Sequence, residues 1–372
     1  MQFAQRIEMN KIIIAAAGSG KTTHLVNEAI RNKNKHILIT TYTDANTEEI
    51  KRKFYDECGC IPKNVSVQPW FTFLLKHCVR PYQGKLYQPR INNLFLVNGQ
   101  SVPFIPENKV SHHYFDKDGR IYSDKIAKFA YRCNERSNGM VIYRLEQIYD
   151  AIYIDETQDL SGWDLDFLYL LFLSDIEILC VGDPRQSTLR TNNSSKNKRK
   201  SQINLLTHFR AIAKEYSLDI DINTLNTNHR SVKDICDFSN SLYANEDWPQ
   251  TQSDFDPKGE SHLGVFLVDS PNVDNYLDKY NPIQLRDKIN VPINTNFSAF
   301  NFGKSKGLTL QRVLIYPTDT MMDWLFKGKV LQNGTKCKFY VAITRARLSV
   351  GIVRKQKYTK YSCSLPIWIP EL

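Results

Sequence analysis

The chain has 372 residues, of which 42% are hydrophobic and 24% are charged, as in folded globular proteins with apolar cores. Its 49 Lys and Arg residues exceed its 39 Asp and Glu residues, and the net charge of +10 favours a polyanionic partner. The longest apolar run, 167–173, is far shorter than the roughly 20 residues of a membrane span. These features exclude an integral membrane protein and a disordered chain. The N-terminus has no signal-peptide pattern, so we expect a cytoplasmic protein.

In the first part of the chain, short β-branched runs alternate with amphipathic stretches, which is typical of a parallel α/β fold. These runs predict strands at 11–16, 36–41, 151–155 and 177–182, and helices at 20–31, 45–57 and 163–173. We expect one sheet formed by 1–80 and 136–225. The stretch 81–135 is weakly periodic and rich in Pro, Gly, Asn, Tyr and His, which predicts a small inserted subdomain.

The rest of the chain predicts a second α/β sheet within 226–372. A helix at 232–244 is followed by candidate strands at 264–268, 296–300, 312–316 and 348–353. The polar, turn-rich stretch 245–260 predicts a loop. Eight scattered cysteines without metal-ligand spacing indicate reduced thiols, and we predict no structural metal.

A glycine-containing loop, AAAGSGKT at 15–22, follows the first strand and opens the first helix, which is the context of a phosphate-binding P-loop. Its glycines allow backbone N–H groups to face phosphate oxygens, and the helix N-terminus adds a positive dipole end. We expect Lys21 to reach the β and γ phosphates and Thr22 to ligate magnesium. Ala15 replaces the first glycine of the strict pattern, and an ordinary strand–helix turn is the alternative interpretation.

An acidic pair, Asp155 and Glu156, ends the apolar strand AIYI. Charges at such a position are costly unless they have partners or a function. We expect Asp155 to hold magnesium and Glu156 to orient and deprotonate an attacking water. A solvated strand end explains many isolated pairs of this kind, but together with the P-loop the pair completes a nucleotide site.

Further motifs follow in a fixed order: VGDPRQS at 181–187, NHRS at 228–231, GKSKGLT at 303–309 and YVAITRAR at 340–347. With AAGSGKT, TYTDANTEEI and DETQD, this series resembles the motifs of UvrD/PcrA/Rep-like superfamily 1 DNA helicases, from residue 15 to residue 347. The resemblance implies an α/β chain with two RecA-like P-loop NTPase domains. These are 1A (1–80 and 136–225), with a reduced 1B-like insertion (81–135), and 2A (226–372), with the large 2B-type insertion absent.

The resemblance also implies roles for individual residues. ATP is bound by the phosphate loop, and Mg²⁺ is held by Thr22 and Asp155. Gln186 resembles the glutamine that couples nucleotide state to DNA contacts, and Arg230 and Arg345 resemble two arginines that approach the γ phosphate from the second domain. The catalytic candidates are thus Lys21, Glu156, Gln186, Arg230 and Arg345. The nucleotide-binding candidates are Ala17, Gly18, Ser19, Gly20, Lys21, Thr22, Thr23, Gln5, His229, Gly307, Arg230 and Arg345.

Two positions depart from the family pattern, and one assignment is open between two residues. His229 takes the place of a tyrosine that stacks on adenine. Thr309 stands where close relatives have a glutamate near the ribose. The glutamine that reads adenine should precede the first strand, where Gln2 and Gln5 are both candidates.

By position, the first-domain contact loops for single-stranded nucleic acid contain Thr41, Tyr42 and Thr43, then Trp70 and Phe71. Aromatic side chains suit this role because every base has a π face. We prefer Trp70 and Phe71 as stacking residues, and a place in the core is the alternative for Phe71. Lys304 is a candidate phosphate contact.

The stretch 184–214 contains no acidic residue. Where the relatives carry an aromatic residue after the glutamine motif, this chain has Leu189 and Arg190, followed by a basic, Ser/Asn-rich segment. We predict that Arg190, Lys196, Lys198, Arg199 and Lys200 contact nucleic acid with strong salt dependence. A merely solvated loop is the alternative.

The first functional hypothesis is an ATP-dependent DNA helicase or single-stranded DNA translocase, moving 3′ to 5′ as the resemblance implies. Its partner would be single-stranded or partially duplex DNA. The second is a nucleotide-gated regulatory ATPase that accompanies a nuclease partner protein, for example in anti-phage defence, with little unwinding alone. A third is a P-loop NTPase that acts on something other than nucleic acid. The motifs do not fix DNA over RNA or the polarity.

Overall fold

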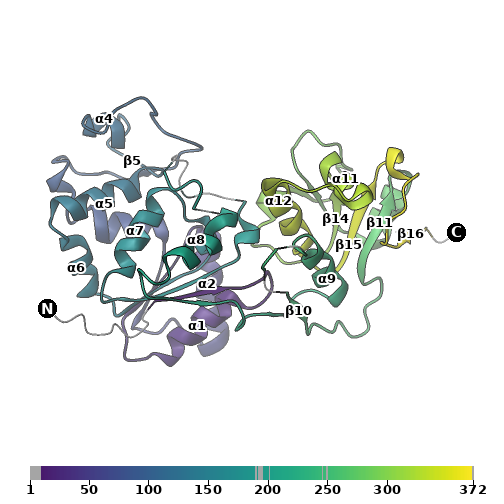
Figure 1. Cartoon of the computed structure of the whole chain (residues 1–372), viewed down its shortest axis with the longest axis horizontal. Helices are drawn as coiled ribbons and strands as arrows, with labels where there is room; N and C mark the ends of the chain where they lie inside the picture. Colours follow the sequence, from purple (N-terminus) through teal and green to yellow (C-terminus); the bar gives the residue numbers. More distant parts are fainter. Residues whose placement is uncertain are drawn as a thin grey trace. The chain divides into compact units, whose positions relative to one another are not determined.

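The computed structural model describes residues 10–188, 191, 196–200, 202–244, 246–248 and 250–370. The chain divides into two compact units, coloured purple to teal and green to yellow in Figure 1. The first comprises the described part of Met1–Ile14 and of Lys21–Thr224, and the second comprises Ala15–Gly20 with the described part of Leu225–Leu372. No helix in these described ranges is long and apolar enough to cross a bilayer.

The first unit is built on a six-stranded sheet with the order β3-β2-β6-β7-β1-β8, in which all neighbouring strands are parallel. The strands are β1 (Asn10–Ile14), β2 (Ile37–Thr41), β3 (Val65–Pro69), β6 (Ala151–Ile154), β7 (Glu177–Gly182) and β8 (Leu218–Asp221). Because β6, β7 and β1 are neighbours and parallel, their carboxyl ends lie at one edge of the sheet. The phosphate loop, the acidic pair and the VGDPRQS motif all begin at these ends.

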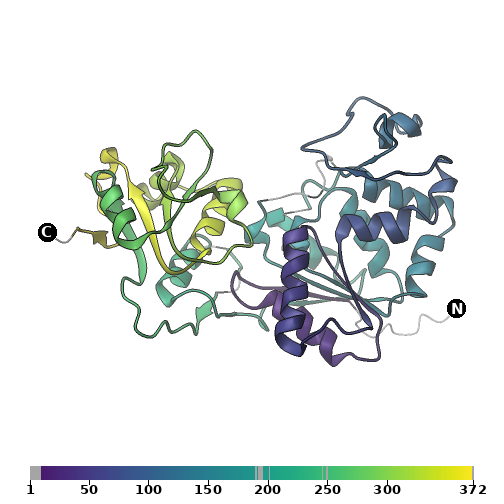
Figure 2. The ribbon, with the colours of Figure 1, turned by 180° about the vertical axis from the view of Figure 1, so that it is seen from behind.

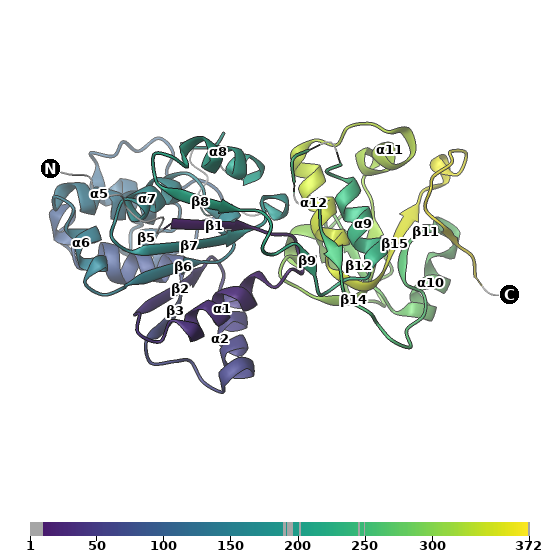
Figure 3. The same cartoon turned by 60° about the horizontal axis from the view of Figure 1, so that its bottom comes forward.

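Helices cover both faces of this sheet. Helices α1 (Lys21–Arg31) and α2 (Asp44–Cys58) lie together on one face, and α5 (Ile126–Arg136), α6 (Met140–Glu146) and α7 (Trp163–Phe172) lie on the other (Figures 2 and 3). The shorter helical segments lie in the connections: α3 (Trp70–Phe73), η1 (Leu74–Val79), η2 (Gln83–Lys85), α4 (Val110–Tyr114), η3 (Thr157–Asp159), η4 (Pro184–Gln186) and η5 (Gln202–Asn204). Helix α8 (Leu205–Ile212) precedes β8.

The predicted insertion contains a small two-stranded sheet of β4 (Leu94–Phe95) and β5 (Ile121–Tyr122). Its last helix, α5, packs against α7 and η1. Residues 126–136 therefore belong to the helical layer over the main sheet.

The second unit contains another six-stranded parallel sheet, with the order β13-β12-β14-β15-β11-β16. Its strands are β11 (Gly264–Asp269), β12 (Ile283–Arg286), β13 (Ala299–Asn301), β14 (Leu310–Tyr316), β15 (Ala346–Arg354) and β16 (Ile367–Trp368), and β9 (Thr227–Asn228) pairs separately with β10 (Gln252–Ser253). The helical segments are α9 (Lys233–Ser241), η6 (Ser270–Asn272), α10 (Val273–Tyr280), η7 (Phe302–Ser305), α11 (Asp319–Lys327), α12 (Asn333–Ile343) and η8 (Gln356–Tyr358). The predicted α/β class with two parallel sheets is confirmed.

One core cluster of the second unit joins α10 to the sheet. It consists of Val268, Tyr276, Leu277, Leu314, Val353 and Trp368. Gly351 on β15 leaves room for this packing, since a Cβ atom there would lie 2.9 Å from Leu314 Cδ1 and 3.0 Å from Tyr276 Cε1. The central strands of the second unit are thus packed to the limit that a glycine allows.

Candidate nucleotide site and nucleic-acid surface

The phosphate loop leaves the carboxyl end of the buried strand β1 and runs into α1, which begins at Lys21. Gly18 and Gly20 both have φ of +78°, a left-handed conformation that glycine adopts without a steric penalty. The hydroxyl of Ser19 donates to the Ala16 carbonyl oxygen at 2.8 Å, which holds the turn. Lys21 is only 8% exposed at the N-terminus of α1. This is the local geometry that the sequence predicts for a phosphate-binding loop.

The candidate metal ligands lie side by side. The Thr22 hydroxyl donates to Asp155 Oδ2 at 2.8 Å, and Asp155 is 4% exposed at the end of β6. Burial, together with the neighbouring Glu156 carboxylate, raises the pKa of Asp155 to about 7, while Thr22 and Lys21 oppose this rise. A buried carboxylate beside a hydroxyl is a set of hard oxygen donors that fits Mg²⁺, an ion that binds proteins through one or two carboxylates. The described residues contain no cluster of three or more His, Cys, Asp or Glu side chains that could hold a metal ion.

Glu156 has a left-handed backbone, with φ of +55°, and its N–H donates to Asp155 Oδ1 at 2.8 Å. Non-glycine residues in this conformation are uncommon and often occur at functional sites. Its carboxylate accepts a hydrogen bond from Gln158 Nε2. The candidate catalytic carboxylate is therefore oriented by a neighbour in the same motif.

A hydrogen-bonded chain links Glu156 to the predicted coupling residue Gln186. Gln158 Oε1 accepts from the Asp183 backbone N–H at 2.9 Å, and Gln158 is completely buried. Asp183 Oδ2 in turn accepts from Gln186 Nε2 at 3.2 Å, and Asp183 Oδ1 accepts from Arg185 Nε at 2.8 Å. The two motifs thus form one network within the first unit. Sequence reasoning missed Gln158 and Asp183 as members, although both lie inside quoted motifs.

The remaining nucleotide-binding candidates differ in their surroundings. The Thr23 hydroxyl accepts a hydrogen bond from Lys53 Nζ on α2 at 2.9 Å. Gly307 has φ of +84° just before β14. Gln5 lies outside the described residues, as does Arg190.

The other candidates lie in the second unit. Arg345 is 1% exposed, and its Nε and Nη1 donate to the Val341 and Leu308 carbonyl oxygens at 3.0 and 3.3 Å. Arg230 Nη1 donates to the Thr344 carbonyl oxygen at 3.3 Å. His229 is exposed, and its Nδ1 lies 2.8 Å from the Asp254 carboxylate.

Two predicted stacking residues are instead part of the core. Trp70 is 1% exposed, and its indole Nε1 donates to Asp164 Oδ1 at 2.6 Å. Phe71 is 7% exposed and packs edge-on against Tyr42, with ring centroids 5.4 Å apart. The prediction that Trp70 and Phe71 stack on bases is therefore wrong, because their faces are covered by protein.

The loop after β2 contains both buried and partly exposed candidates. Thr41 is 1% exposed, so the prediction that its side chain contacts nucleic acid is also wrong. Tyr42 and Thr43 stay partly accessible, and the Thr43 hydroxyl caps α2 by accepting from the Asn46 N–H at 3.1 Å.

Lys196 is engaged with α7. Its Nζ lies 3.2 Å from Asp166 Oδ2 and 3.5 Å from the centroid of the Trp163 ring. Its side chain nevertheless remains 40% exposed, and the predicted phosphate contact of Lys196 stays a prediction. Four other basic candidates have exposed side chains, and their nucleic-acid contacts stay predictions: Lys198, Arg199, Lys200 and Lys304.

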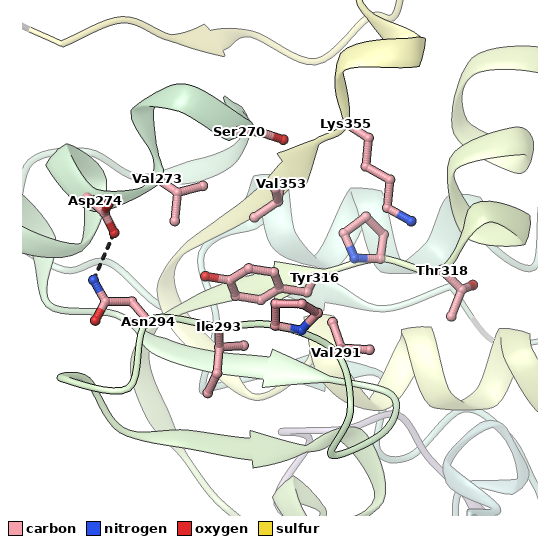
Figure 4. A pocket seen from close by; sticks show the side chains of 12 residues that line it. Ser270, Val273, Asp274, Val291, Ile293, Asn294, Tyr316, Thr318, Val353 and Lys355 are labelled. Carbon is pink, nitrogen blue, oxygen red and sulfur yellow. Dashed lines mark hydrogen bonds between the residues drawn. The ribbon is translucent and has the colours of Figure 1, made fainter.

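The second unit also has a cavity of about 710 Å³ that the sequence did not reveal. Tyr316 lies at its centre, and a hydrogen bond from Asn294 Nδ2 to Asp274 Oδ1 crosses one end (Figure 4). The cavity lies beyond the carboxyl ends of β11, β14 and β15, whereas Arg345 and Gly307 precede β15 and β14. The cavity and these two candidates therefore lie at opposite edges of the second sheet.

A buried strand, a glycine turn and an acidic strand end together define a P-loop NTPase domain, which implies nucleotide binding. Residues 3–192, just over half of the chain, match the family model AAA_19, described as an AAA domain. The chain therefore belongs to this AAA domain family, a superfamily 1 helicase-like domain.

Individual relatives are more distant. Over 129 residues the chain is 28% identical to the probable DNA helicase II homolog of Mycoplasma capricolum subsp. capricolum, a match that covers 35% of this chain and 16% of that protein. Among solved structures, the arterivirus nonstructural protein 10 helicase is matched over 95% of this chain and 61% of that one, with a TM-score of 0.48 and 16% identity. The PRRSV helicase gives 96% and 55%, with a TM-score of 0.45 and 15% identity. The arterivirus helicase in complex with DNA gives 93% and 60%, with a TM-score of 0.46 and 14% identity. The chain thus spans less than two thirds of each of these proteins.

Proposed function

We propose that the chain is an ATP-dependent DNA helicase or single-stranded DNA translocase that moves 3′ to 5′. The observation that carries the proposal is the network from Glu156 through Gln158 and Asp183 to Gln186, beside the Thr22–Asp155 pair. Through such a network, a movement of the coupling glutamine also moves the hydrolytic carboxylate. The name of the relative that aligns with this chain over 129 residues at 28% identity, a probable DNA helicase II homolog, supports DNA as the activator.

In this proposal the first unit contributes the hydrolytic groups. Lys21 binds the β and γ phosphates, and Thr22 and Asp155 hold Mg²⁺, which supplies charge neutralisation of the transferred phosphoryl group when bound. Glu156 orients the attacking water and accepts its proton.

The second unit contributes Arg230 and Arg345, which we assign to the γ phosphate, and His229, which we assign to the adenine. Positive charge at the γ phosphate stabilises the transition state of phosphoryl transfer. In the described structure both arginines donate to backbone carbonyl oxygens, so ATP binding would exchange some of these hydrogen bonds for phosphate contacts. The expected consequence is that ATP changes the hydrogen bonding of Arg230 and Arg345.

The ATPase activity tests the proposal first. Purified protein is assayed with single-stranded DNA, duplex DNA or RNA of matched length as activator, with Glu156→Gln as the inactive control. The proposal predicts that single-stranded DNA stimulates ATP turnover most and that Glu156→Gln abolishes turnover with every activator. Equal turnover with and without nucleic acid would refute the motor assignment.

Polarity has its own test. Streptavidin is placed on a biotin at the 3′ or the 5′ end of a single strand, and ATP-dependent displacement is measured against free biotin as a trap. A 3′-to-5′ translocase displaces streptavidin from the 5′ end. Displacement from the 3′ end alone would contradict the proposed direction.

A further inference from the structure

A buried carboxylate that no predicted role uses lies at the first turn of α7. Asp164 is 1% exposed, and each of its oxygens accepts a hydrogen bond from another side chain. Trp70 Nε1 donates to Oδ1 at 2.6 Å, and the Thr191 hydroxyl donates to Oδ2 at 2.8 Å. The two donors are 121 residues apart in the sequence (191 − 70), so Asp164 joins two distant segments.

Each of the two segments borders a candidate functional residue. Trp70 is followed by Phe71, which packs on the partly accessible Tyr42 of the candidate nucleic-acid loop. Thr191 lies five residues after Gln186. Thr191 is also fixed to the acidic motif, because its N–H donates to the Asp159 carbonyl oxygen at 3.0 Å.

The first turn of α7 also contacts two residues that follow Thr191 in the sequence, Lys196 and Asn197. Asn197 has φ of +55°, and its Nδ2 donates to Asp166 Oδ2 and to the Gly162 carbonyl oxygen, each at 2.9 Å. Lys196 covers the Trp163 ring at 3.5 Å. Thr191 on the one hand, and Lys196 and Asn197 on the other, are therefore each held against α7.

Because the Asp164 carboxylate is buried, its energy depends on the hydrogen bonds from both Trp70 and Thr191. Burial raises the pKa of Asp164 to about 7, while the hydrogen bonds from Trp70 and Thr191 lower it. A buried charge that loses one of its side-chain donors is strongly destabilised. A displacement of one segment therefore changes the energy with which Asp164 holds the other.

We propose that Asp164 is a positioning residue that transmits nucleic-acid binding at the Tyr42 loop, through Trp70 and Thr191, to the segment that carries Gln186. This inference rests on the proposed function, since it assigns a route by which the activator reaches the hydrolytic network. Asp164 touches neither substrate. Its role is to hold the Trp70 and Thr191 side chains together.

Amide hydrogen exchange tests the joint without requiring any enzymatic activity. Thr191→Val removes a hydroxyl while keeping the side-chain shape, and Trp70→Phe removes the indole N–H while keeping an aromatic ring. Each change should speed exchange in the opposite segment by about tenfold, the effect of losing one hydrogen bond to a charged group. Tyr169→Phe is the matched control, because its hydroxyl bonds to His208 from the same helix, α7. Exchange confined to the mutated segment would overturn the coupling.

The ATPase assay then tests its consequence. Thr191→Val should lower the stimulation by single-stranded DNA at least fivefold, with basal turnover and the KM for ATP within about twofold of the parent. Asp164→Asn, which keeps an oxygen for Trp70, should retain more stimulation than Asp164→Ala. Unchanged stimulation in Thr191→Val and Asp164→Ala would refute transmission through Asp164. If single-stranded DNA does not stimulate the parent protein, the proposed function fails. The hydrogen-exchange experiment alone then tests whether Asp164 couples the Trp70 and Thr191 segments.

Discussion

Gly182 is the position where one added methyl group should cut the link between Glu156 and Gln186. A Cβ atom at Gly182 would lie 2.6 Å from Gln158 Oε1 and 3.4 Å from the backbone nitrogens of Thr157 and Gln158. Only the Gln158 side chain is too close, so Gly182→Ala should displace the carboxamide by about 0.8 Å (3.4 − 2.6) and leave the strand intact. The hydrogen bond from the Asp183 N–H to Gln158 Oε1, now 2.9 Å, would then be lost.

The size of the effect follows from burial. A buried N–H without an acceptor costs about 1–3 kcal/mol, and at about 3 °C per kcal/mol the unfolding transition of the first unit should fall by about 3–9 °C. The displaced Gln158 also releases the Glu156 carboxylate. A misplacement of this order at a catalytic group lowers turnover by about tenfold to a hundredfold.

Thermal unfolding and the ATPase rate are measured on the same samples. Gly84→Ala is the control, because the nearest atom to its added Cβ, Gln88 Oε1, is 4.0 Å away. If Gly182→Ala unfolds at the parent temperature and turns over ATP at the parent rate, then Gln158 does not orient Glu156 in the way described.

Three further predictions concern the second unit and the basic segment. Gly351→Ala should destabilise the second unit by about 1–3 kcal/mol through overpacking against β14 and α10, and an unchanged denaturant midpoint would contradict that packing. Burial between two aromatic rings, with nearby positive charges, lowers the pKa of His262 from 6.5 to about 4. On acidification the unfolded state therefore binds a proton before the folded state does. The stability contributed by neutral His262 is complete above pH 6.5 and is lost as the pH falls towards 4. His262→Gln should remove this pH dependence from a pH series of unfolding midpoints. Replacing Lys198, Arg199 and Lys200 together by Gln should lower the salt slope of single-stranded DNA binding by up to about 2, and a parental slope would exclude these side chains as phosphate contacts.

Most of the strands that the sequence predicts correctly have nearly uninterrupted apolar runs. Strands β2, β6 and β7 are recognised because their residues are buried on both faces. Strand β12 is missed because the polar residue Gln284 interrupts its apolar run. In the structure Gln284 is completely buried, and its side-chain Nε2 donates to the Asn294 carbonyl oxygen at 2.7 Å. Such a partner lies in a later loop, so a local pattern cannot reveal it.

The same limit explains the errors at the candidate site. The phosphate loop and the acidic pair follow from residue type and local context, and the bond between Thr22 and Asp155 is the one that their pairing requires. The error on Trp70 arises because its partner, Asp164, is 94 residues away in the sequence. A pattern of aromatic residues does not tell a buried hydrogen-bonded indole from an exposed stacking platform.

The central claim, nucleic-acid-dependent ATP hydrolysis at the Lys21 loop, has one most direct test. ATP turnover and single-stranded DNA binding are measured together for the parent protein and for Lys21→Ala. The account predicts turnover that rises with single-stranded DNA in the parent, and no turnover with DNA binding retained in Lys21→Ala. Turnover in Lys21→Ala at the parent rate, or a parent rate that ignores DNA, would contradict it.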